Sequence, residues 1–477
     1  MAGSGTNPDF PPVELDALQR AVWAAIVPYR DRLINIAYSG GTDSTALLFV
    51  IASLRSRMGL KLRLLHVNHG WNEKSEAWAV HCNSVSRELG VPFESFLLGS
   101  DPSFESHPPV FAGSSKEARA RDVRYRWFSE VVDCEDVLLT GHHLDDQAET
   151  LLLRLMRGSS VRGLAAMRSE QTLDGLKVVR PFLNVPRGTL VRWVSDKGLR
   201  VLDDPSNNDD AFDRNFLRHA ILPRLCTRWP ETAKILGRAA LQFEDTQMLL
   251  DEVAAEDFAR CRFSDPSSYL FHLGVVSIEG ILGLSRARLL NVFRFWARVC
   301  TLQSPSERAL REFIRQLETA GPGSSPSMKL GSAVFRTYQD GLFLVPCPVR
   351  KNASKPAERF WDGSSVKIYG PDIELVPKRT VASGFRAALL SDGVIELRWR
   401  RGSTRVTPLG RGPQRHTLRK VLQEIRMPPW ERDRIPLIFV NGEFAGMPQA
   451  VVDQSYRAGA GEAGLEIHLR DLRESCD

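Results

Sequence analysis

The hexapeptide Ser39-Gly40-Gly41-Thr42-Asp43-Ser44 decides the fold of this 477-residue sequence. It follows an apolar run, LINIAY (33–38), and opens a helix predicted over about 43–57. Paired glycines let the backbone turn sharply and bring N–H groups close to an anion, and the helix N-terminus adds partial positive charge. Ser39 and Ser44 add hydroxyl groups, and Asp43 is expected to cap the helix or to face a magnesium ion. The hexapeptide therefore predicts a phosphate-binding loop at the end of a strand.

Two better-known phosphate-binding patterns do not describe this loop. It is neither the Walker sequence GxxxxGK[ST] nor the dinucleotide fingerprint GxGxxG. The alternative without a ligand is an Asp-capped helix that follows a glycine turn.

Strands and helices alternate along the first third of the chain. Strands are predicted over 33–38, 61–67, 91–98 and 137–141, and helices over about 43–57, 75–89, 115–132 and 145–157. Such alternation is typical of an α/β fold with a doubly wound parallel sheet covered on both faces. Ligands of such sheets bind at the C-terminal ends of the strands, where the polar motifs of this sequence fall.

The length predicts about three domains. The expected divisions are an α/β domain over 1–225, a helical middle domain over 226–346, a linker and the start of the C-terminal region over 347–390, and a small, basic α+β domain over 391–477. Between Arg398 and Arg434, eleven Lys or Arg residues stand against three acidic residues, and the whole chain carries a net charge of +6. This local excess indicates contacts with phosphates.

Composition excludes several classes of protein. No stretch approaches the ~18 uncharged apolar residues that a membrane helix needs, and the N-terminus lacks the features of a secretory signal, so a cytoplasmic location and no membrane partner are expected. The seven cysteines are dispersed and none forms a CxxC pair. A disulfide scaffold, a zinc site and an iron–sulfur cluster are therefore not expected.

A second polar motif, HHLDDQAET, covers residues 142–150. Asp146 and Glu149 are three residues apart on a predicted helix and share one face, with His142 just before it at a strand end. Two carboxylates and an imidazole can hold a metal, bind an ammonium group or take a proton. The alternative is that Asp145 and Asp146 only cap the helix. The zinc-binding pattern HExxH is absent.

Arg121 and Arg124 lie three residues apart on another predicted helix. Two interpretations are open for them. They form a solvated basic face, or one of them contacts an ATP phosphate and stabilises charge at the α-phosphate.

The hexapeptide SGGTDS resembles the pyrophosphate loop of the N-type ATP pyrophosphatases, the PP-loop superfamily. Later segments resemble one branch of it, the tRNA(Ile)-lysidine synthetases. They are HVNHG (66–70), ARDVRY (120–125), TGHHLDDQAET (140–150), RGS (157–159), Arg180-Pro181, DPSN (204–207), Arg214-Asn215, Arg218-His219, PPW (428–430) and RDRIPL (432–437). The order and spacing match over residues 30–225 and about 395–455. Trp71, Asn72 and Ser160 depart from the family pattern.

The resemblance implies an ATP-dependent ligase. Such an enzyme would adenylate the wobble cytidine of the CAU-anticodon tRNA(Ile) and couple L-lysine to its C2, releasing AMP and pyrophosphate and changing codon specificity from AUG to AUA. The 1–225 domain would bind ATP and Mg²⁺, and the two later domains would bind the tRNA. A homodimer is a further expectation.

Residue roles follow from the same resemblance. The loop Ser39–Ser44 and His66 would bind ATP, and Asp43 and Asp146 would hold Mg²⁺. Asp146 and Glu149 would bind lysine, His142 or a carboxylate would take its proton, and Arg121 would act at the phosphate. The alternatives are a tRNA thiolase, which generally needs paired cysteines, a glutamine-dependent synthetase, which needs an amidotransferase half, and a non-catalytic RNA-binding protein.

Overall fold

The structure is a computed structural model of the chain. It describes residues 12, 14–68, 70, 75–98, 116–173, 175–203, 212–263, 271–321, 323–347, 359–368, 373–388, 393–399, 404–408 and 414–472, and the side chains of 116–118 are not described. Two compact units, Met1–Leu249 and Leu250–Asp477, make up the chain. Each unit is described by itself.

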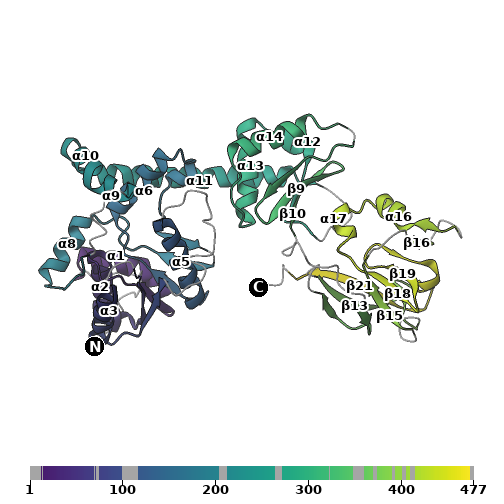
Figure 1. Cartoon of the computed structure of the whole chain (residues 1–477), viewed down its shortest axis with the longest axis horizontal. Helices are drawn as coiled ribbons and strands as arrows, with labels where there is room; N and C mark the ends of the chain where they lie inside the picture. The colour runs from purple at the N-terminus through teal and green to yellow at the C-terminus, as the bar shows by residue number, and fades with distance from the viewer. Residues whose placement is uncertain are drawn as a thin grey trace, which may run out of the picture. The chain divides into compact units, whose positions relative to one another are not determined.

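Unit 1 is built on a six-stranded sheet with the order β3-β2-β1-β4-β6-β5 (Figure 1). The strands β3, β2, β1, β4 and β6 run parallel, and β5 pairs antiparallel with β6. Their bounds are β1 Leu33–Ala37, β2 Lys61–Asn68, β3 Phe93–Leu97, β4 Val137–Leu139, β5 Glu170–Leu173 and β6 Leu176–Val179. The predicted doubly wound α/β fold is confirmed.

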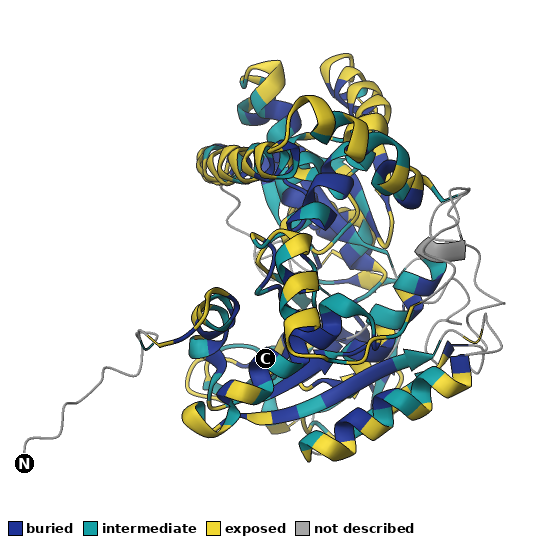
Figure 2. Ribbon diagram, turned by 90° about the vertical axis from the view of Figure 1, so that its left-hand side faces the viewer, coloured by how far each residue is buried: buried dark blue, intermediate teal, exposed yellow. Residues whose placement is uncertain are grey.

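Helices cover both faces of this sheet. Ile34 and Ile36 of β1 belong to a buried core shared with α1, α2, α3 and α8, whereas Leu138 of β4 belongs to a second core with Trp127 and Phe128 of α5. Alternate residues of a strand point to opposite faces, which explains the two cores. The strands are mostly buried and the outer sides of the helices exposed (Figure 2). The helices are α1 Ala17–Ile26, α2 Thr42–Met58, α3 Ser75–Leu89, α5 Lys116–Val131, α6 Leu144–Met156, α7 Val161–Leu164 and α8 Arg187–Asp196, with a 3-10 turn at Val27–Tyr29.

The strand order places the site. Because β1 lies between β2 and β4, the chain leaves β1 toward one side and later returns on the other. The C-terminal ends of β1 and β4 are therefore adjacent, at the point where ligands of doubly wound sheets bind. The segments that follow these two strands are the hexapeptide and the HHLDDQAET motif.

The remainder of unit 1 is a helical extension. It consists of α9 (Asp213–Phe216), a π-helical turn (Leu217–Ile221), α10 (Leu222–Arg228) and α11 (Thr232–Arg260), which continues past the end of the unit. The side chain of Leu144 at the start of α6 packs on Gly237 of α11, where an added Cβ would lie 2.6 Å from Leu144 Cδ1.

Unit 2 begins with helices packed on a four-stranded sheet of order β7-β10-β9-β8. Aromatic side chains, Phe293, Trp296, Phe313 and Phe335, fill the core between them. The predicted middle region is therefore helical with a sheet at its end. The elements are β7 Val275–Ser277, α12 Ile278–Leu282, α13 Arg286–Val299, α14 Glu307–Glu318, β8 Ser327–Leu330, β9 Ala333–Tyr338 and β10 Gly341–Pro346.

The rest of unit 2 is rich in strands, as the predicted α+β region requires. The sheets have the orders β11-β15-β18-β19-β20, β12-β13-β21-β14 and β16-β17. The elements are β11 Arg359–Trp361, β12 Val366–Ile368, β13 Ile373–Val381, β14 Phe385–Arg386, β15 Ile395–Arg398, β16 Arg405–Val406, β17 His416–Thr417, α16 Leu418–Glu424, α17 Pro429–Arg432, β18 Leu437–Val440, β19 Glu443–Met447, β20 Val451–Val452, a 3-10 turn Gln454–Tyr456 and β21 Ala463–Asp471.

Candidate active site

The hexapeptide forms a tight loop between β1 and α2. Gly41 is the N-cap of α2, Gly40 has a φ of +80°, and Asp43 lies in the first turn of the helix. The hydroxyls of Ser39 and Ser44 are 3.0 Å apart, and the Ser44 hydroxyl donates to the Gly41 carbonyl oxygen at 3.1 Å. The first-turn N–H groups of α2 thus face the space beyond β1, as an anion-binding loop requires.

Two glycines allow the close packing of this loop. An added Cβ at Gly40 would lie 2.5 Å from Leu202 Cδ1, and the Leu202 N–H donates to the Gly40 carbonyl at 2.9 Å. At Gly141, just after β4, a Cβ would lie 2.9 Å from the Asp43 carbonyl oxygen and 3.1 Å from the Ser44 nitrogen. Backbone atoms cannot move aside as a flexible side chain can, so Gly141 sets how closely β4 approaches the loop.

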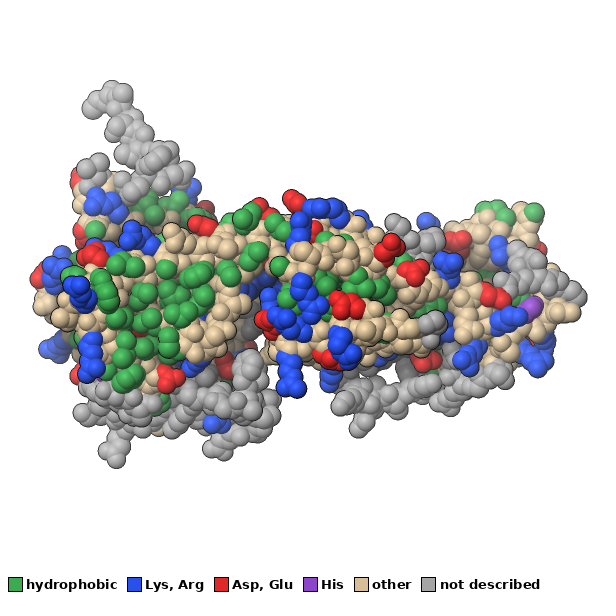
Figure 3. Space-filling model, turned by 90° about the horizontal axis from the view of Figure 1, so that it is seen from above, with side chains coloured by type: hydrophobic (Ala, Val, Ile, Leu, Met, Phe, Trp, Pro, Cys, Tyr) green, Lys and Arg blue, Asp and Glu red, His purple; other side chains and the backbone are tan. Residues whose placement is uncertain are grey.

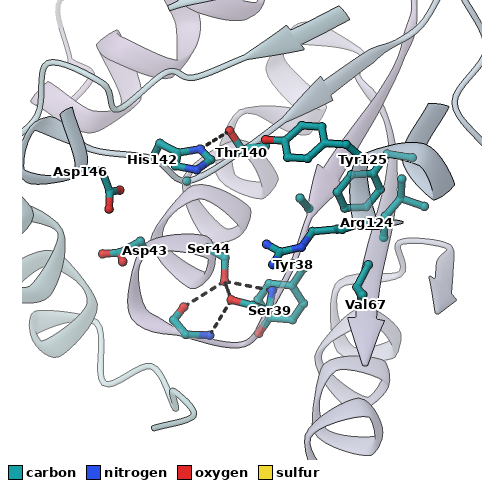
Figure 4. Close-up of a pocket in the computed structure, with 15 residues that line it drawn as sticks. Tyr38, Ser39, Asp43, Ser44, Val67, Arg124, Tyr125, Thr140, His142 and Asp146 are labelled. Carbon is teal, nitrogen blue, oxygen red and sulfur yellow. Dashed lines mark hydrogen bonds between the residues drawn. The ribbon is translucent and has the colours of Figure 1, made fainter. Parts of the chain in front are cut away.

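A pocket of about 230 Å³ opens over the ends of β1 and β4. Asp43 and Asp146 lie at one end of it, and Val67, Arg124 and Tyr125 lie at the other (Figure 4). One wall is polar and the other mainly apolar, which suits a molecule with a charged part and a flat ring. The lining residues are Ala37, Tyr38, Ser39, Gly41, Asp43, Ser44, Leu65, Val67, Arg124, Tyr125, Phe128, Thr140, Gly141, His142 and Asp146.

The two histidines of the second motif occupy different environments. His142 faces the pocket, and its Nδ1 lies 2.8 Å from the Thr140 hydroxyl. Burial lowers the pKa of His142 to about 3, because desolvation disfavours the cation more than nearby Asp146 favours it. The ring is therefore neutral at physiological pH.

His143 is buried and joins two helices. It caps α6, accepting the Asp146 N–H at Nδ1 at 3.3 Å, while its Nε2 lies 3.5 Å from Asp43 Oδ2 and 3.4 Å from Asp146 Oδ2. Burial opposes a charge on this ring, but the carboxylates of Asp43, Asp146 and Asp145 outweigh it and raise the pKa of His143. The N-cap residue of α6 is thus His143 and not Asp145, whose carboxylate accepts the backbone N–H of Arg187 at 2.8 Å. Asp146 does take part in the cap, because its carboxylate accepts the His143 N–H at 3.0 Å.

Asp146 and Glu149 lie side by side, as their spacing predicts, and both are buried. Two arginines from α9 and the π-helical turn bind them. Arg214 donates to Glu149 at 2.7 Å and to Asp146 at 2.9 Å, and Arg218 donates to the same carboxylates at 2.7 and 3.3 Å. Burial raises the pKa of Asp146, but His143, Arg214 and His142 outweigh it and lower that pKa to about 2. Asp146 is therefore ionised.

Of the two arginines on α5, Arg124 is the one that lines the pocket, and its guanidinium points into it (Figure 4). The Arg121 guanidinium lies over the Tyr125 ring, 4.9 Å from its centroid. Arg121 is still close enough to help lower the pKa of His142. The structure thus brings both arginines to the site and places Arg124, not Arg121, in the lining of the pocket.

Five of the predicted site residues are not among those that line this pocket: Gly40, Thr42, His66, Arg121 and Glu149. The His66 side chain is buried, and its Nδ1 lies 2.9 Å from the Tyr38 carbonyl oxygen, so it supports the backbone at the entrance to the hexapeptide. Burial lowers the pKa of His66, which keeps the ring neutral.

The described residues contain no group of three or more His, Cys, Asp or Glu side chains arranged to hold a metal ion. Asp43 and Asp146 nevertheless fit a Mg²⁺ ion, which proteins commonly hold through one or two carboxylates together with substrate phosphates. Among the described residues, the Asp43 Oδ1 atom is buried and accepts no hydrogen bond. It therefore has a lone pair to offer to an ion.

The sequence motifs assign no role to several residues of the site. His143 lies within the HHLDDQAET motif, and Arg214, Arg218 and Arg180 belong to segments that carry the family resemblance. Arg180 is buried, donates to the Arg168 carbonyl at 2.7 Å, and has its pKa lowered by burial. The one available signal was the arginine pair at i, i+4, which places both guanidinium groups on one helix face.

Part of the basic stretch Arg398–Arg434 has a structural role. Arg432 is buried and donates to the Met427 carbonyl, and Arg434 donates to the Pro346 carbonyl at 2.9 Å. Trp430 packs edge-on against Tyr338 and Phe343, which supports its interpretation as a packing residue. Arg419 and Lys420, at the start of α16, are exposed. His69, Trp71, Asn72 and residues 204–207 lie outside the described residues.

No helix among the described residues is long and apolar enough to cross a membrane.

Comparison with family models gives three matches along the chain: a PP-loop domain at residues 15–225, a TilS substrate binding domain at 277–343 and a TilS substrate C-terminal domain at 395–469. The domain boundaries predicted from the sequence remain predictions.

Three similar proteins bear the name tRNA(Ile)-lysidine synthase. The one from Legionella pneumophila (strain Paris) is 32% identical over 89% of this chain and 92% of its own length. Those from Alkalilimnicola ehrlichii and Pseudomonas syringae pv. tomato are 35% and 36% identical, covering 84% and 88% of this chain and 86% and 89% of their own lengths. Among solved structures, a U34-tRNA thiolase from Methanococcus maripaludis has a TM-score of 0.41 and 18% identity, over 48% of this chain and 78% of its own.

Proposed function

This chain belongs to the tRNA(Ile)-lysidine synthase family, and we propose that it ligates lysine to C2 of the wobble cytidine in the CAU-anticodon tRNA(Ile). ATP is the energy source, cleaved to AMP and pyrophosphate. One observation carries the proposal: the phosphate loop and the carboxylate of Asp146 line the same pocket. A nucleotide and an incoming amine can therefore meet in one cavity. The modified tRNA would read the codon AUA in place of AUG. We expect the reaction to take place in the cytoplasm.

In the first step, the cytidine O2 attacks the α-phosphorus of ATP and the bond to pyrophosphate breaks. The N–H groups and hydroxyls of Ser39–Ser44 would hold the pyrophosphate. Leu65, Val67 and Phe128 offer apolar walls to the adenine ring. Asp43 and Asp146 would hold a Mg²⁺ ion, which supplies neutralisation of phosphate charge when it is bound. Arg124, with Arg121 behind Tyr125, would stabilise charge at the α-phosphate.

In the second step, the lysine ε-nitrogen attacks C2, the C2–O bond breaks, and AMP leaves with that oxygen. The amine has an ordinary pKa near 10.4, so it must first lose a proton. Asp146, which lines the pocket, would bind the lysine, with Glu149 behind it held by Arg214 and Arg218. The positive charge of these two arginines disfavours a further cation there, which opposes the effect of the carboxylates on the pKa of the amine. His142 or one of the two carboxylates would take this proton.

A thiolase reaction is not favoured. The similar proteins are lysidine synthases, and the six described cysteines are all free and dispersed. A homodimer remains a prediction that sedimentation of the purified chain can test.

The test is reconstitution with purified chain, a CAU-anticodon tRNA(Ile) transcript, ATP, Mg²⁺ and lysine. Nucleosides from the digested tRNA are analysed by mass spectrometry, and AMP is measured in parallel. We expect lysidine and AMP in equal amounts, and neither when lysine and tRNA are both omitted. A thiolated nucleoside, or ATP consumption independent of tRNA, would contradict the proposal.

A further inference from the structure

One helical segment next to the site is rich in arginine and free of acidic residues. From Arg214 to Pro230 the sequence is RNFLRHAILPRLCTRWP, with four arginines and no Asp or Glu. It covers most of α9, the π-helical turn and α10. The two faces of this segment carry different side chains, and the site described above uses only one of them.

The inner face holds the carboxylates. Arg214 and Arg218 reach Asp146 and Glu149 at 2.7 to 3.3 Å, so the position of this segment is fixed relative to the pocket. The π-helical turn Leu217–Ile221 follows directly, and such turns are frequent at functional sites. The opposite face therefore belongs to a segment whose inner face is anchored beside the pocket.

The outer face, defined here as Phe216, Arg224, Arg228 and Trp229, is open to solvent. Phe216 is 47% exposed and Trp229 is 55% exposed. Both arginines are exposed, and neither has an ion-pair partner among the described residues. The acidic residues that flank the segment are already paired, Asp213 with Arg157 and Glu231 with Lys234, so the exposed arginines of this face stay available for an anionic partner.

Exposed apolar side chains extend this surface at the end of α6. Leu155 is 50% exposed and Met156 is 74% exposed, and the next residue, Arg157, pairs with Asp213 of α9 at 3.4 Å. The ion pair places the end of α6 beside the start of the outer face. Hydrophobic side chains indeed gather on the part of the molecule formed by unit 1 in the view from above, with Lys and Arg at the margin (Figure 3).

This chemistry fits single-stranded RNA. Guanidinium groups bind phosphates, and unpaired bases stack on aromatic rings. The wobble nucleotide must leave its loop to reach the pocket, so its neighbours in the chain must pass over the adjoining surface. We infer that the outer face binds the tRNA anticodon loop beside the wobble nucleotide, with Arg224 and Arg228 on phosphates and a flanking base on Phe216. This inference rests on the proposed function.

A second copy of the chain is a poorer occupant of this face. In a two-fold dimer the same patch meets itself, so residue i of one copy faces the corresponding region of the other. Arg224 and Arg228 of both copies would then come together, and the neighbouring Glu231 is already paired with Lys234. Like charges facing each other across an interface disfavour association.

The experiment compares Arg224→Gln/Arg228→Gln with a charge-matched control, Arg20→Gln/Arg87→Gln. The control arginines are exposed on α1 and α3 and have no ion-pair partner among the described residues. Affinity for the CAU-anticodon tRNA(Ile) is measured between low and high salt. We expect the Arg224/Arg228 variant to bind roughly tenfold more weakly, with a salt slope lower by about one to two units, because each lost phosphate contact removes roughly 0.7 to 0.9 units. The control variant should bind like the wild type.

Stacking is tested with Phe216→Ala and a tRNA that carries 2-aminopurine next to the wobble cytidine. Binding of the wild type should quench the fluorescence of this base, and the variant should not. All these side chains are exposed, so unchanged thermal unfolding is expected and is measured for each variant. At saturating tRNA, kcat of the Arg224/Arg228 variant should stay within about twofold, since the loss is one of binding.

If the variants keep the affinity, the salt slope and the fluorescence quenching of the wild type, the inference is wrong. An equal loss in the Arg20/Arg87 control would overturn it, because that result would show that only net charge matters. A change in sedimentation without a change in tRNA binding would identify the face as a protein interface and would also overturn it. If the wild type forms no lysidine, the proposed function fails; if it forms lysidine and the variants bind normally, only this inference fails.

Discussion

The Nε2 atom of His143 lies 3.5 Å from the Asp43 carboxylate and so connects the first turn of α2 to the N-cap of α6. The same nitrogen lies 3.4 Å from the carboxylate of Asp146. A single buried imidazole therefore holds together the two acidic residues assigned to the metal and the amine. The contacts of this ring connect the phosphate loop to the HHLDDQAET motif, so two motifs about one hundred residues apart form one site.

Asp146→Asn should reduce lysidine formation by at least tenfold, because an ammonium group and a metal ion both need the carboxylate charge. Asp145→Asn is the matched control. Asp145 is the adjacent residue, and it accepts the Arg187 N–H instead of facing the pocket. Single-turnover lysidine formation is the measurement. If both variants react equally fast, the Asp146 carboxylate has no special part in the reaction.

Asp43→Ala should abolish pyrophosphate release while tRNA binding stays within a few-fold of the wild type. The reason is that Asp43 lies in the first turn of α2, lines the pocket and has a buried oxygen that accepts no hydrogen bond from the described residues. Asp31→Ala, at an exposed aspartate before β1, serves as the control. Near-normal pyrophosphate release by the Asp43 variant would remove this residue from the proposed mechanism.

Gly141→Ala should raise the KM for ATP by tenfold or more. The new methyl group would lie 2.9 Å from the Asp43 carbonyl oxygen, so the backbone of the phosphate loop must move. Gly188→Ala is the control, since a Cβ there meets nothing within 4 Å and the residue lies in α8. The control should be neutral or slightly stabilising, because alanine favours a helix over glycine. An unchanged KM for ATP in the Gly141 variant would show that the loop tolerates displacement.

The two histidines of the HHLDDQAET motif should affect stability with opposite pH dependence. The pKa of His142 is lowered to about 3 in the folded chain, below its ordinary value of 6.5. Between these two values the unfolded chain binds a proton that the folded chain does not, so the free energy of unfolding falls by up to ~1.4 kcal/mol per pH unit as pH decreases. The pKa of His143 is raised, so its contribution is present below pH 6.5 and lost as pH rises through the folded value.

Denaturant unfolding of wild type, His142→Gln and His143→Gln between pH 5 and 8 checks this. Replacing His142 should lessen the fall in the free energy of unfolding at acidic pH. Replacing His143 should lower the free energy of unfolding more at pH 5 than at pH 8. Parallel pH profiles for all three proteins would show that neither histidine differs from an exposed one.

A structural feature of this site could be predicted from the sequence when it depends only on residues close together in the chain. The phosphate loop and the pair Asp146 and Glu149 follow from short spacings within one element, and the structure places them as those spacings predict. The partners of Glu149 cannot be predicted from such spacings. Arg214 and Arg218 are 65 and 69 residues away in the sequence and reach Glu149 only through tertiary packing. Similarly, the rotation of α5 about its axis decides that Arg124 and not Arg121 lines the pocket.

A count of charges cannot separate surface from core. Arg432 and Arg434 contribute to the basic excess of the C-terminal region, yet they donate to the Met427 and Pro346 carbonyls. No pattern within the stretch distinguishes them from the exposed Arg419, because their acceptors are backbone oxygens that any sequence supplies.

The C-terminal region should therefore bind tRNA through its exposed residues only. Arg419→Gln/Lys420→Gln should lower tRNA affinity and reduce the salt slope by roughly one unit per lost phosphate contact, because each contact releases condensed counterions. Arg432→Gln should instead lower thermal stability, because its removal leaves the buried Met427 carbonyl without its donor. Salt-dependent tRNA binding and thermal unfolding, measured on both variants, separate the two effects. ATP affinity should stay unchanged in both, since the residues that line the nucleotide pocket all belong to unit 1. If the Arg419/Lys420 variant keeps the wild-type slope and affinity, these two residues are surface charges without a partner, and the tRNA is held elsewhere on the chain.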